Sequence, residues 1–317
     1  IKKILRHCKN FDYVITSYGD AFSLFAGQCF HKYHKETPWI FDIRDAVYRY
    51  KFTPCYVSWI AKLYEKQIWK NADCILGVSK GICRRVPSKY RKKVHCLTNG
   101  YDISDRENLR VERLNTSKLV FTYTGSMYGG IRDLSILFEI IREAINKGDI
   151  EEDTLEFHYA GNASAYEIFK NQAQKYALGK NCITHGKLSH KEALQLQQQS
   201  DILLVASYDY QSSQGGVITG KALEYMSAQR PIIAIVMGDI EHSELADIIR
   251  NTNLGIAYED AHKKDDYEKL YAYLCGLYKE FVETGKIEYR PDKNELRKYD
   301  YRNLSKRLIK IMNRIEK

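Results

Sequence analysis

The chain has 317 residues, of which 44% are hydrophobic and 28% charged, and its formal net charge is +9. This length suits two domains, and this hydrophobic content is enough for two buried cores. None of its eight cysteines forms a Cys-x-x-Cys pair, and no apolar stretch approaches ~18 residues. These features argue against a disulfide framework, a zinc site and a membrane-spanning segment, and we expect a cytoplasmic protein.

Strand-like apolar runs alternate with helix-like segments in the first third of the chain. The expected strands are 11–16, 39–43, 73–79 and 94–100, with helices near 20–34, 55–71 and 80–88. Such alternation predicts a parallel sheet covered by helices. The polar stretch 101–118 has no apolar period and is interpreted as a linker and domain boundary.

The densest basic cluster, RRVPSKYRKK, occupies residues 84–93. A solvated helix end followed by a turn would explain it, and so would a patch that contacts an anionic membrane surface or acceptor. A nucleic-acid site is disfavoured, because the run is short and no recognition-helix or RNA-binding signature accompanies it.

After the linker the alternation restarts. The expected strands are 119–125, 155–161, 182–186, 201–207, 231–237 and 254–259. They predict one doubly wound domain of about six strands. The tail 299–317 spaces its apolar residues as one helix face. We therefore divide the chain into a first Rossmann-like domain (1–112), a second (113–295) and a C-terminal helix (296–317) that we expect to pack back on the first domain.

Four points beyond strand ends could bind a ligand, because backbone N–H groups and helix N-termini face a crevice there. The first is YTGSMYGGIRD (123–133), where Gly125 lets the backbone approach an anion closely and Arg132 could clamp a phosphate. A plain turn is the alternative. The second is THGKLSH (184–190), where the backbone of Gly186, Lys187 and Leu188 could pair with a nucleobase edge.

The third point is GGVITGKALEYMSAQRPIIA (215–234), which contains G-x-x-x-x-G-K. A P-loop needs Ser or Thr after the lysine and a strand directly before the glycines. Ala222 follows Lys221, and residues 208–214 separate the strand from Gly215, so an ATP site is disfavoured.

A helix that starts near Ile218 would place Lys221 and Glu224 on one face. Lys221 and the N–H groups around Gly215 and Gly216 would then hold a diphosphate, helped by the helix dipole. Glu224 would accept hydrogen bonds from two neighbouring hydroxyls, as on a ribose. A surface Lys–Glu pair is the alternative.

The fourth point is FDIRDAVYRY (41–50), just past a strand of the first domain. Asp42, Arg44 and Asp45 could face an acceptor there. An ion pair within a loop is the alternative interpretation.

Three segments together resemble glycosyltransferase family 4: residues 72–102, 121–141 and 220–234, the last reading GKALEYMSAQRPIIA. The resemblance covers nearly the whole chain, and the order and spacing of the segments carry it. It implies the GT-B fold, in which two Rossmann-like domains face each other across a cleft. It also implies a retaining, metal-independent enzyme.

By this resemblance, Glu224 matches the second Glu of the family's E-x₇-E element, which is associated with the donor ribose. Lys221 matches the lysine of a K-x-x-E-Y helix in a polysaccharide-assembly branch and would neutralise the donor diphosphate. Two positions depart from the pattern, since Gly216 replaces the first Glu and Ser126 replaces an Arg of the diphosphate loop. The backbone of the glycines and Arg132 are expected to substitute.

The first domain also departs from the family, because a complete one would usually open with another strand and glycine-rich loop before residues 11–16. We therefore expect this domain to be N-terminally incomplete.

The resemblance thus implies transfer of a sugar from a nucleoside-diphosphate sugar, expected to be UDP-linked, to a hydroxyl of a glycan or lipid-linked glycan. Lys221, Arg132 and Asp45 are the expected catalytic residues, with no cofactor, no metal and no nucleic acid. The sequence contains no Asp-x-Asp pair, which agrees with a metal-free site. The expected role is bacterial cell-surface polysaccharide assembly, with peripheral contact at the inner membrane face. A catalytically silent binding subunit and a UDP-sugar epimerase are the alternatives.

Overall fold

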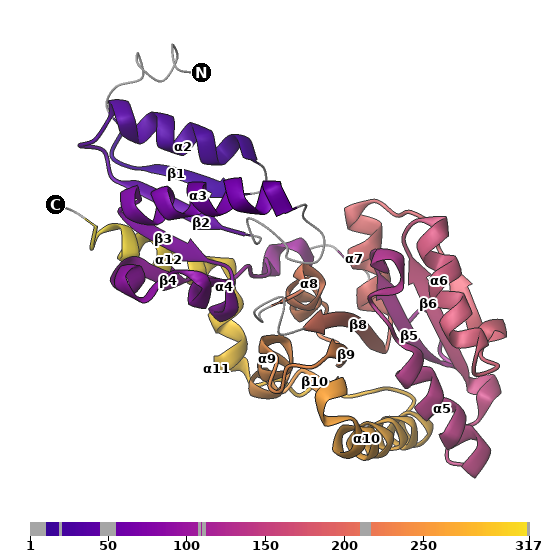
Figure 1. Ribbon diagram of the computed structural model, residues 1–317. Coiled ribbons are helices and arrows are strands. Elements are labelled where there is room, and N and C mark those ends of the chain that lie inside the picture. Colours follow the sequence, from indigo (N-terminus) through magenta and orange to yellow (C-terminus); the bar gives the residue numbers. More distant parts are fainter. Residues whose placement is uncertain are drawn as a thin grey trace. The chain divides into compact units, whose positions relative to one another are not determined.

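A computed structural model describes residues 11–18, 21–44, 55–106, 109, 112–209 and 217–315 (Figure 1). The chain divides into two compact units. The first unit comprises residues 1–99, 211–216 and 302–317, and the second comprises residues 100–210 and 217–301. Much of the segment interpreted as a linker therefore belongs to the second unit, where Tyr101 is buried and forms a parallel bridge with Asp300.

The first unit contains a four-stranded parallel sheet with strand order β1-β2-β3-β4. Its elements are β1 (Val14–Tyr18), α2 (Ala21–Tyr33), β2 (Trp39–Ile43), α3 (Cys55–Asn71), β3 (Cys74–Gly77), α4 (Lys80–Arg85), η1 (Ser88–Lys93) and β4 (Val94–Cys96). Every residue of β2 and β3 is buried, which explains their nearly continuous apolar runs. The third strand ends earlier than predicted because Ser79 caps α4, its side chain accepting the Ile82 N–H at 3.1 Å.

Helix α12 (Tyr301–Met312) packs on this first sheet (Figure 1). Its apolar residues Leu304 and Ile311 are buried in a cluster that includes Ile40 and Leu76. Arg307 donates to the Cys96 carbonyl at 3.1 Å. The apolar face seen in the sequence of the tail is therefore used against the strands of the first unit.

The second unit contains a parallel sheet of six strands, the number that the sequence predicted, and its strand order is β10-β9-β8-β5-β6-β7. Its strands are β5 (Leu119–Thr124), β6 (Leu155–Ala160), β7 (Cys182–Thr184), β8 (Ile202–Asp209), β9 (Ile232–Gly238) and β10 (Gly255–Glu259). Its α-helices are α5 (Ser135–Lys147), α6 (Ala163–Gln174), α7 (His190–Gln199), α8 (Gly220–Ala228), α9 (Glu244–Thr252), α10 (Lys263–Thr284) and α11 (Lys293–Leu296). Its 3₁₀ turns are η2 (Ile103–Arg106), η3 (Tyr128–Gly130), η4 (Glu152–Thr154), η5 (Gly179–Asn181), η7 (Asp260–His262) and η8 (Arg297–Tyr299).

Two apolar clusters lie on opposite faces of this second sheet. One joins Phe121 and Phe157 of the strands to residues of α5, α6 and α10. The other joins Leu203 and Ala234 to residues of α8 and α9. Helices on both faces define a doubly wound sheet, so ligand sites are expected at the carboxyl ends of its strands.

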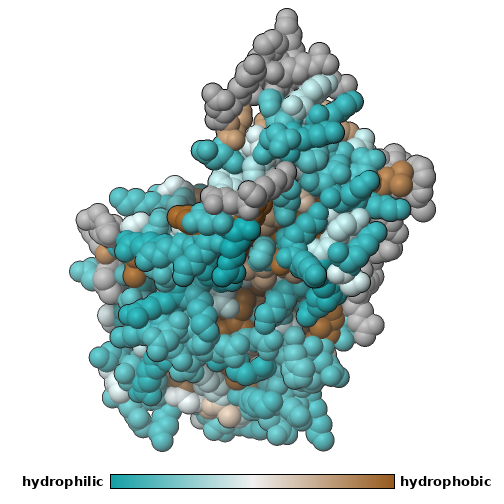
Figure 2. Space-filling model, turned by 90° about the vertical axis from the view of Figure 1, so that its left-hand side faces the viewer, coloured by the Kyte–Doolittle hydropathy of each residue, from teal (hydrophilic) through white to brown (hydrophobic). Residues whose placement is uncertain are grey.

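Hydrophilic side chains dominate the face drawn in Figure 2, and apolar residues are scattered over it in small groups. Among the described residues, no helix combines the length and the apolar content needed to cross a bilayer.

Candidate active site

The predicted Lys221–Glu224 pair lies at the start of α8. The helix begins at Gly220, close to the predicted Ile218, and Thr219 caps it by accepting the Ala222 N–H at 3.3 Å. Lys221 Nζ lies 2.8 Å from Glu224 Oε1, and both side chains are partly buried. The ion pair considered as an alternative is therefore present, but it is not on an open surface.

A glutamine that the sequence analysis missed holds Glu224 in place. Gln197 of α7 is fully buried and its Nε2 donates to Glu224 Oε1 at 2.6 Å and to Thr124 Oγ1 at 3.0 Å. Tyr225 of α8 hydrogen-bonds the same threonine at 3.0 Å. Within the described part of the chain, Oε2 of Glu224 accepts no hydrogen bond, so this oxygen is available to a ligand.

Gly125, at the end of β5, lies against the Lys221 side chain. A Cβ built on Gly125 would meet Lys221 Cε and Cγ at 3.8 Å, and the residue has a φ of +132° that L side chains rarely adopt. Its carbonyl accepts the Tyr159 hydroxyl at 2.6 Å. Burial raises the pKa of Tyr159, so this phenol stays protonated and remains a donor.

Backbone hydrogen bonds connect the turns that follow β5, β6 and β7. The Gly125 N–H donates to Ala160 O, and the Gly161 N–H donates to Gly186 O, both at 2.9 Å. Gly186 has a φ of +66°, and after it Lys187 is exposed and Leu188 is half-buried. The structure thus brings the first two predicted ligand segments together at one edge of the sheet.

Arg132 and Ser126 belong to the turn after Gly125. The Ser126 carbonyl accepts Arg132 Nη1 at 3.2 Å, and the Arg132 guanidinium lies 4.4 Å from the centre of the Tyr128 ring. Arg132 Nε is buried and makes no hydrogen bond among the described residues. That Arg132 substitutes for the family arginine replaced by Ser126 therefore stays a prediction.

Two histidines meet behind the Gly186 turn. His158 Nδ1 lies 2.8 Å from His185 Nε2, and the rings are stacked. Burial and the neighbouring His158 lower the pKa of His185, which favours its neutral form. The sequence analysis did not predict this pair, because His158 belongs to β6 and His185 follows β7.

The first unit carries its own polar group at the carboxyl end of β2. Asp42 is buried, and its Oδ2 accepts Arg44 Nε at 2.6 Å and Ser17 Oγ at 2.8 Å. Arg44 also donates to Asn99 Oδ1 at 2.6 Å. The ion pair considered as the alternative is therefore present at a strand end. Its hydrogen bonds reach β1 through Ser17 and the segment after β4 through Asn99, two residues that the sequence analysis missed.

Three predicted site residues lie outside the described residues: Asp45, Gly215 and Gly216. The remaining ones group at two strand edges, one in each unit.

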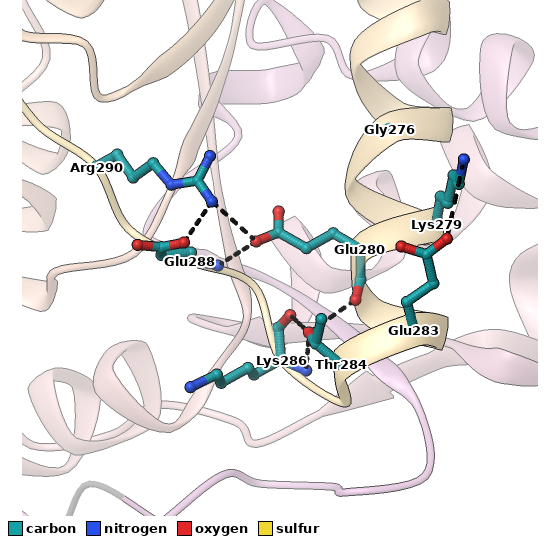
Figure 3. A pocket seen from close by; sticks show the side chains of 8 residues that line it. All are labelled: Gly276, Lys279, Glu280, Glu283, Thr284, Lys286, Glu288 and Arg290. Atoms are coloured by element: carbon teal, nitrogen blue, oxygen red, sulfur yellow. Dashed lines mark hydrogen bonds and ion pairs between the residues drawn. The ribbon is translucent and has the colours of Figure 1, made fainter.

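A polar pocket of about 520 Å³ is lined by residues of α10 and of the segment after it (Figure 3). Its charged lining residues are Lys279, Glu280, Glu283, Lys286, Glu288 and Arg290. The next residue after α10, Gly285, accepts a hydrogen bond from Arg113, which also bonds Lys118 just before β5. This pocket is therefore at the amino-terminal edge of the sheet, and its charges pair with one another.

The fold and the site define a protein with parallel α/β units, in which the carboxyl edge of the second sheet carries Lys221 and the turns of Gly125 and Gly186. Residues 118–277, half of the chain, match the family of glycosyl transferases group 1, and the chain belongs to this family. The protein is a glycosyltransferase. No curated protein matches the sequence.

Solved structures with a similar fold include a lipopolysaccharide outer core galactosyltransferase, WaaB (TM-score 0.63, 16% identity, covering 98% of this chain and 77% of that one). A UDP-forming α,α-trehalose-phosphate synthase from Burkholderia xenovorans has a TM-score of 0.66 at 9% identity, with coverage of 100% and 77%. Sucrose-phosphate synthase from Thermosynechococcus elongatus has a TM-score of 0.60 at 15% identity, with coverage of 96% and 74%. The predicted GT-B fold is confirmed.

Proposed function

We propose that this glycosyltransferase moves a sugar from a nucleoside-diphosphate sugar to a hydroxyl of a glycan, with retention at the anomeric carbon and without a catalytic metal. The observation that carries the proposal is the partly buried Lys221–Glu224 pair in the first turn of α8, beside Gly125. Membership of the group 1 family supports it.

The donor would bind across the carboxyl edge of the second sheet. Lys221, the free N–H groups of the first turn of α8 and the backbone at Gly125 would hold the diphosphate, where the positive end of the helix dipole favours an anion. Glu224 would accept hydrogen bonds from the ribose hydroxyls at its available Oε2. The backbone of Gly186, Lys187 and Leu188 would contact the base.

The departing diphosphate gains negative charge as the bond to the sugar breaks. Lys221 would stabilise this charge, with Arg132 as a second cation and the helix N-terminus as a third source of positive potential. Donors aimed at developing charge lower a barrier by roughly 3–4 kcal/mol each when they are fixed in advance. The ion pair with Glu224 holds Lys221 in position before the donor binds. When the donor binds, the Lys221 ammonium would contact a phosphate oxygen in place of Glu224 Oε1.

The acceptor would bind on the first unit. Asp42 is a buried carboxylate with one unpaired oxygen, Oδ1, among the described residues, and Arg44 beside it is about one-third exposed. A carboxylate can accept the hydrogen bond of an incoming hydroxyl. Asp45, which lies outside the described residues, remains the residue proposed from the sequence to contact the acceptor.

The donor that we propose is a UDP-sugar, as expected from the sequence, and one structural neighbour is named as UDP-forming. The resemblance to family 4, and to its polysaccharide-assembly branch, supports a role in building a bacterial cell-surface polysaccharide on a lipid carrier.

Basic side chains of the first unit would favour contact with an anionic membrane surface. Arg84, Lys89, Arg91 and Lys92 are exposed on α4 and η1. Lys306, Arg307 and Lys310 are exposed on α12 of the same unit. Each basic residue near such a surface adds about 1 kcal/mol of attraction. Loss of vesicle binding when these lysines are changed to glutamine would be the expected result, and salt should weaken the binding of the unchanged protein.

The test of the proposed donor site is a thermal-shift panel with UDP, GDP, ADP and NAD, each in the presence of EDTA. We expect UDP to raise Tm, and Glu224→Ala to abolish the shift, because Glu224 would be the ribose ligand. The control is Glu283→Ala, which changes an exposed glutamate of the Figure 3 pocket. If none of the tested diphosphates raises Tm, the protein would be a catalytically silent member of the family. If Glu224→Ala transfers sugar as fast as the unchanged protein, this assignment of the donor site is ruled out.

A further inference from the structure

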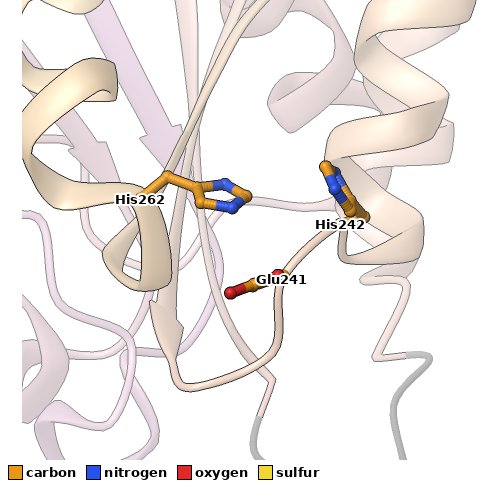
Figure 4. A group of neighbouring side chains, drawn as sticks. All are labelled: Glu241, His242 and His262. Carbon is orange, nitrogen blue, oxygen red and sulfur yellow. The ribbon is translucent and has the colours of Figure 1, made fainter.

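A second cluster of chemically active side chains lies at the carboxyl ends of β9 and β10. It consists of Glu241 and His242, on the turn between β9 and α9, and His262 of η7 (Figure 4). One carboxylate oxygen and one nitrogen of each imidazole lie within 4.8 Å of one another. The proposed donor site does not use any of these residues.

We propose that Glu241, His242 and His262 form a binding site for Zn²⁺ or a similar first-row divalent metal. Two imidazoles and one carboxylate suit these ions, which bind nitrogen and oxygen ligands at about 2.0–2.2 Å. In a tetrahedral site, ligand atoms are roughly 3.3 Å apart. Since all three ligand atoms lie within 4.8 Å of one another, each pair needs to approach by at most about 1.5 Å. Small rotations of the exposed Glu241 and His242 side chains would allow this.

A buried carboxylate lies beside His262. Glu259 Oε2 lies 3.9 Å from His262 Nδ1, and the glutamate is 1% exposed. At this distance the two groups form no hydrogen bond, but the buried negative charge of Glu259 would favour a cation bound next to His262.

The same glutamate connects the two turns that carry the ligands. Its Oε1 accepts the Ser243 N–H at 2.6 Å, directly after His242. Its own N–H donates to Asp266 at 3.0 Å, in the first turn of α10. Ser243 in turn caps α9. The ligand-bearing backbone is therefore fixed on both sides, and only side chains have to move when a metal binds.

This inference departs from the sequence analysis, which predicted no metal. That prediction rested on the spacing of cysteines and on the absence of an Asp-x-Asp pair, and neither concerns histidines about twenty residues apart. The inferred ion lies beyond the reaction proposed above, since its ligands belong to different turns from those of Lys221 and Gly125. Its effect would be to tie the β9–α9 turn to η7.

The experiment is a calorimetric titration of the whole chain, stripped with EDTA and dialysed, with ZnCl₂ and no nucleotide present. The expected result is a site of one ion per chain whose affinity falls at least tenfold in His242→Ala and in His262→Ala. The control is His190→Ala, an exposed histidine at the start of α7, which should bind as the unchanged protein does. Equal affinity in all four proteins would overturn the proposal.

A second measurement covers the case in which a variant fails to fold. Diethyl pyrocarbonate modifies accessible imidazoles, and mass spectrometry locates the products on the unchanged protein. Zn²⁺ should protect His242 and His262 and leave His190 reactive. Modification of His242 and His262 at the same rate with and without Zn²⁺ would overturn the proposal. Neither measurement depends on a donor, so a failed metal site and a failed donor site are distinguishable.

Discussion

The two parallel sheets end in opposite chemistry. At the carboxyl edge of the second sheet, Gly125 and Gly186 have positive φ values and Lys221 supplies a cation. At the corresponding edge of the first sheet, Asp42 supplies a buried carboxylate. Under the proposed function, one architecture would serve two substrates. Backbone N–H groups and a lysine suit an anionic donor, whereas a carboxylate suits the hydroxyl of an acceptor.

The two edges are also held differently. Backbone hydrogen bonds connect Gly125 to Ala160 and Gly161 to Gly186, so the geometry of the second edge depends on its main chain. In the first unit, side chains of Ser17 and Arg44 hold the carboxylate. At the first edge, substitutions of these side chains should therefore change activity. At the second edge, substitutions that add a Cβ to a glycine should change the stability of the fold.

The largest expected effect is that of Lys221→Met. It removes the cation beside Gly125 and leaves Glu224 bonded to Gln197, so the fold should persist. We expect kcat/KM for transfer to fall by about 10²–10³, as for loss of one preorganised donor. Steady-state kinetics with the donor identified by thermal shift would measure it.

The matched control for this variant is Lys279→Met. Lys279 is 77% exposed and its partner, Glu283, is also exposed. Its substitution should leave kcat/KM unchanged. A loss of less than tenfold in Lys221→Met would break the contrast between the two edges, because the second edge would then not act through its lysine.

Asp42→Asn should separate the two edges most clearly. The amide loses the charge that binds Arg44, and a hydrogen bond to a charged group contributes about 1.5–3 kcal/mol. Transfer to the acceptor should therefore fall about 10- to 100-fold. UDP affinity, measured by calorimetry, should stay within about twofold, since binding to the second edge does not involve Asp42. An equal loss of UDP affinity would contradict an acceptor-side role.

Gly161→Ala should act on folding. A Cβ there would lie 2.3 Å from the Tyr159 hydroxyl and 2.6 Å from the Gly125 carbonyl oxygen. Overpacking of this kind costs about 1–3 kcal/mol of the free energy of unfolding, which urea denaturation would measure. Gly276→Ala is the control, because a Cβ there meets nothing within 4 Å, and alanine favours its helix by up to about 1 kcal/mol. Similar destabilisation in both would show that the glycine is not required for space.

Much of this arrangement could be predicted from the sequence, for physical reasons. Buried parallel strands are nearly continuous apolar runs. For this reason each of the ten described strands overlaps a strand predicted from the sequence. Lys221 and Glu224 could be paired because residues three apart share a helix face. The resemblance supplied the fold, and the family match and structural neighbours confirmed it.

Other residues could not be found in this way. Gln197 lies in a polar run, LQLQQQS, in which nothing marks one glutamine as buried. Ser17 and Asn99 lie about eighty residues apart along the chain and are linked through the Asp42–Arg44 pair, in which Ser17 contacts Asp42 and Asn99 contacts Arg44. The cluster of Glu241, His242 and His262 has no spacing motif, since a turn and a strand end bring it together. Side-chain contacts between distant segments are properties of the fold rather than of local pattern.

The smallest expected effect concerns pH, and it compares one histidine in each unit. Burial and His158 lower the pKa of His185 in the second unit, and burial and Arg314 lower the pKa of His95 in the first. A lowered pKa means that the unfolded chain binds the proton more readily, so the stability of the folded state falls as pH drops below about 6.5. Each group can contribute at most about 1.4 kcal/mol per pH unit.

Urea denaturation at pH 7.5, 6.5 and 5.5 would measure this dependence. His185→Asn and His95→Asn should each flatten the loss of stability between pH 6.5 and 5.5, and the double variant should flatten it further. If only one variant changes the slope, the two units differ in how they bury an imidazole. An unchanged slope in both would mean that folding does not favour the neutral form of either histidine. The stacked pair beside Gly186 would then not stabilise the second edge through its protonation state.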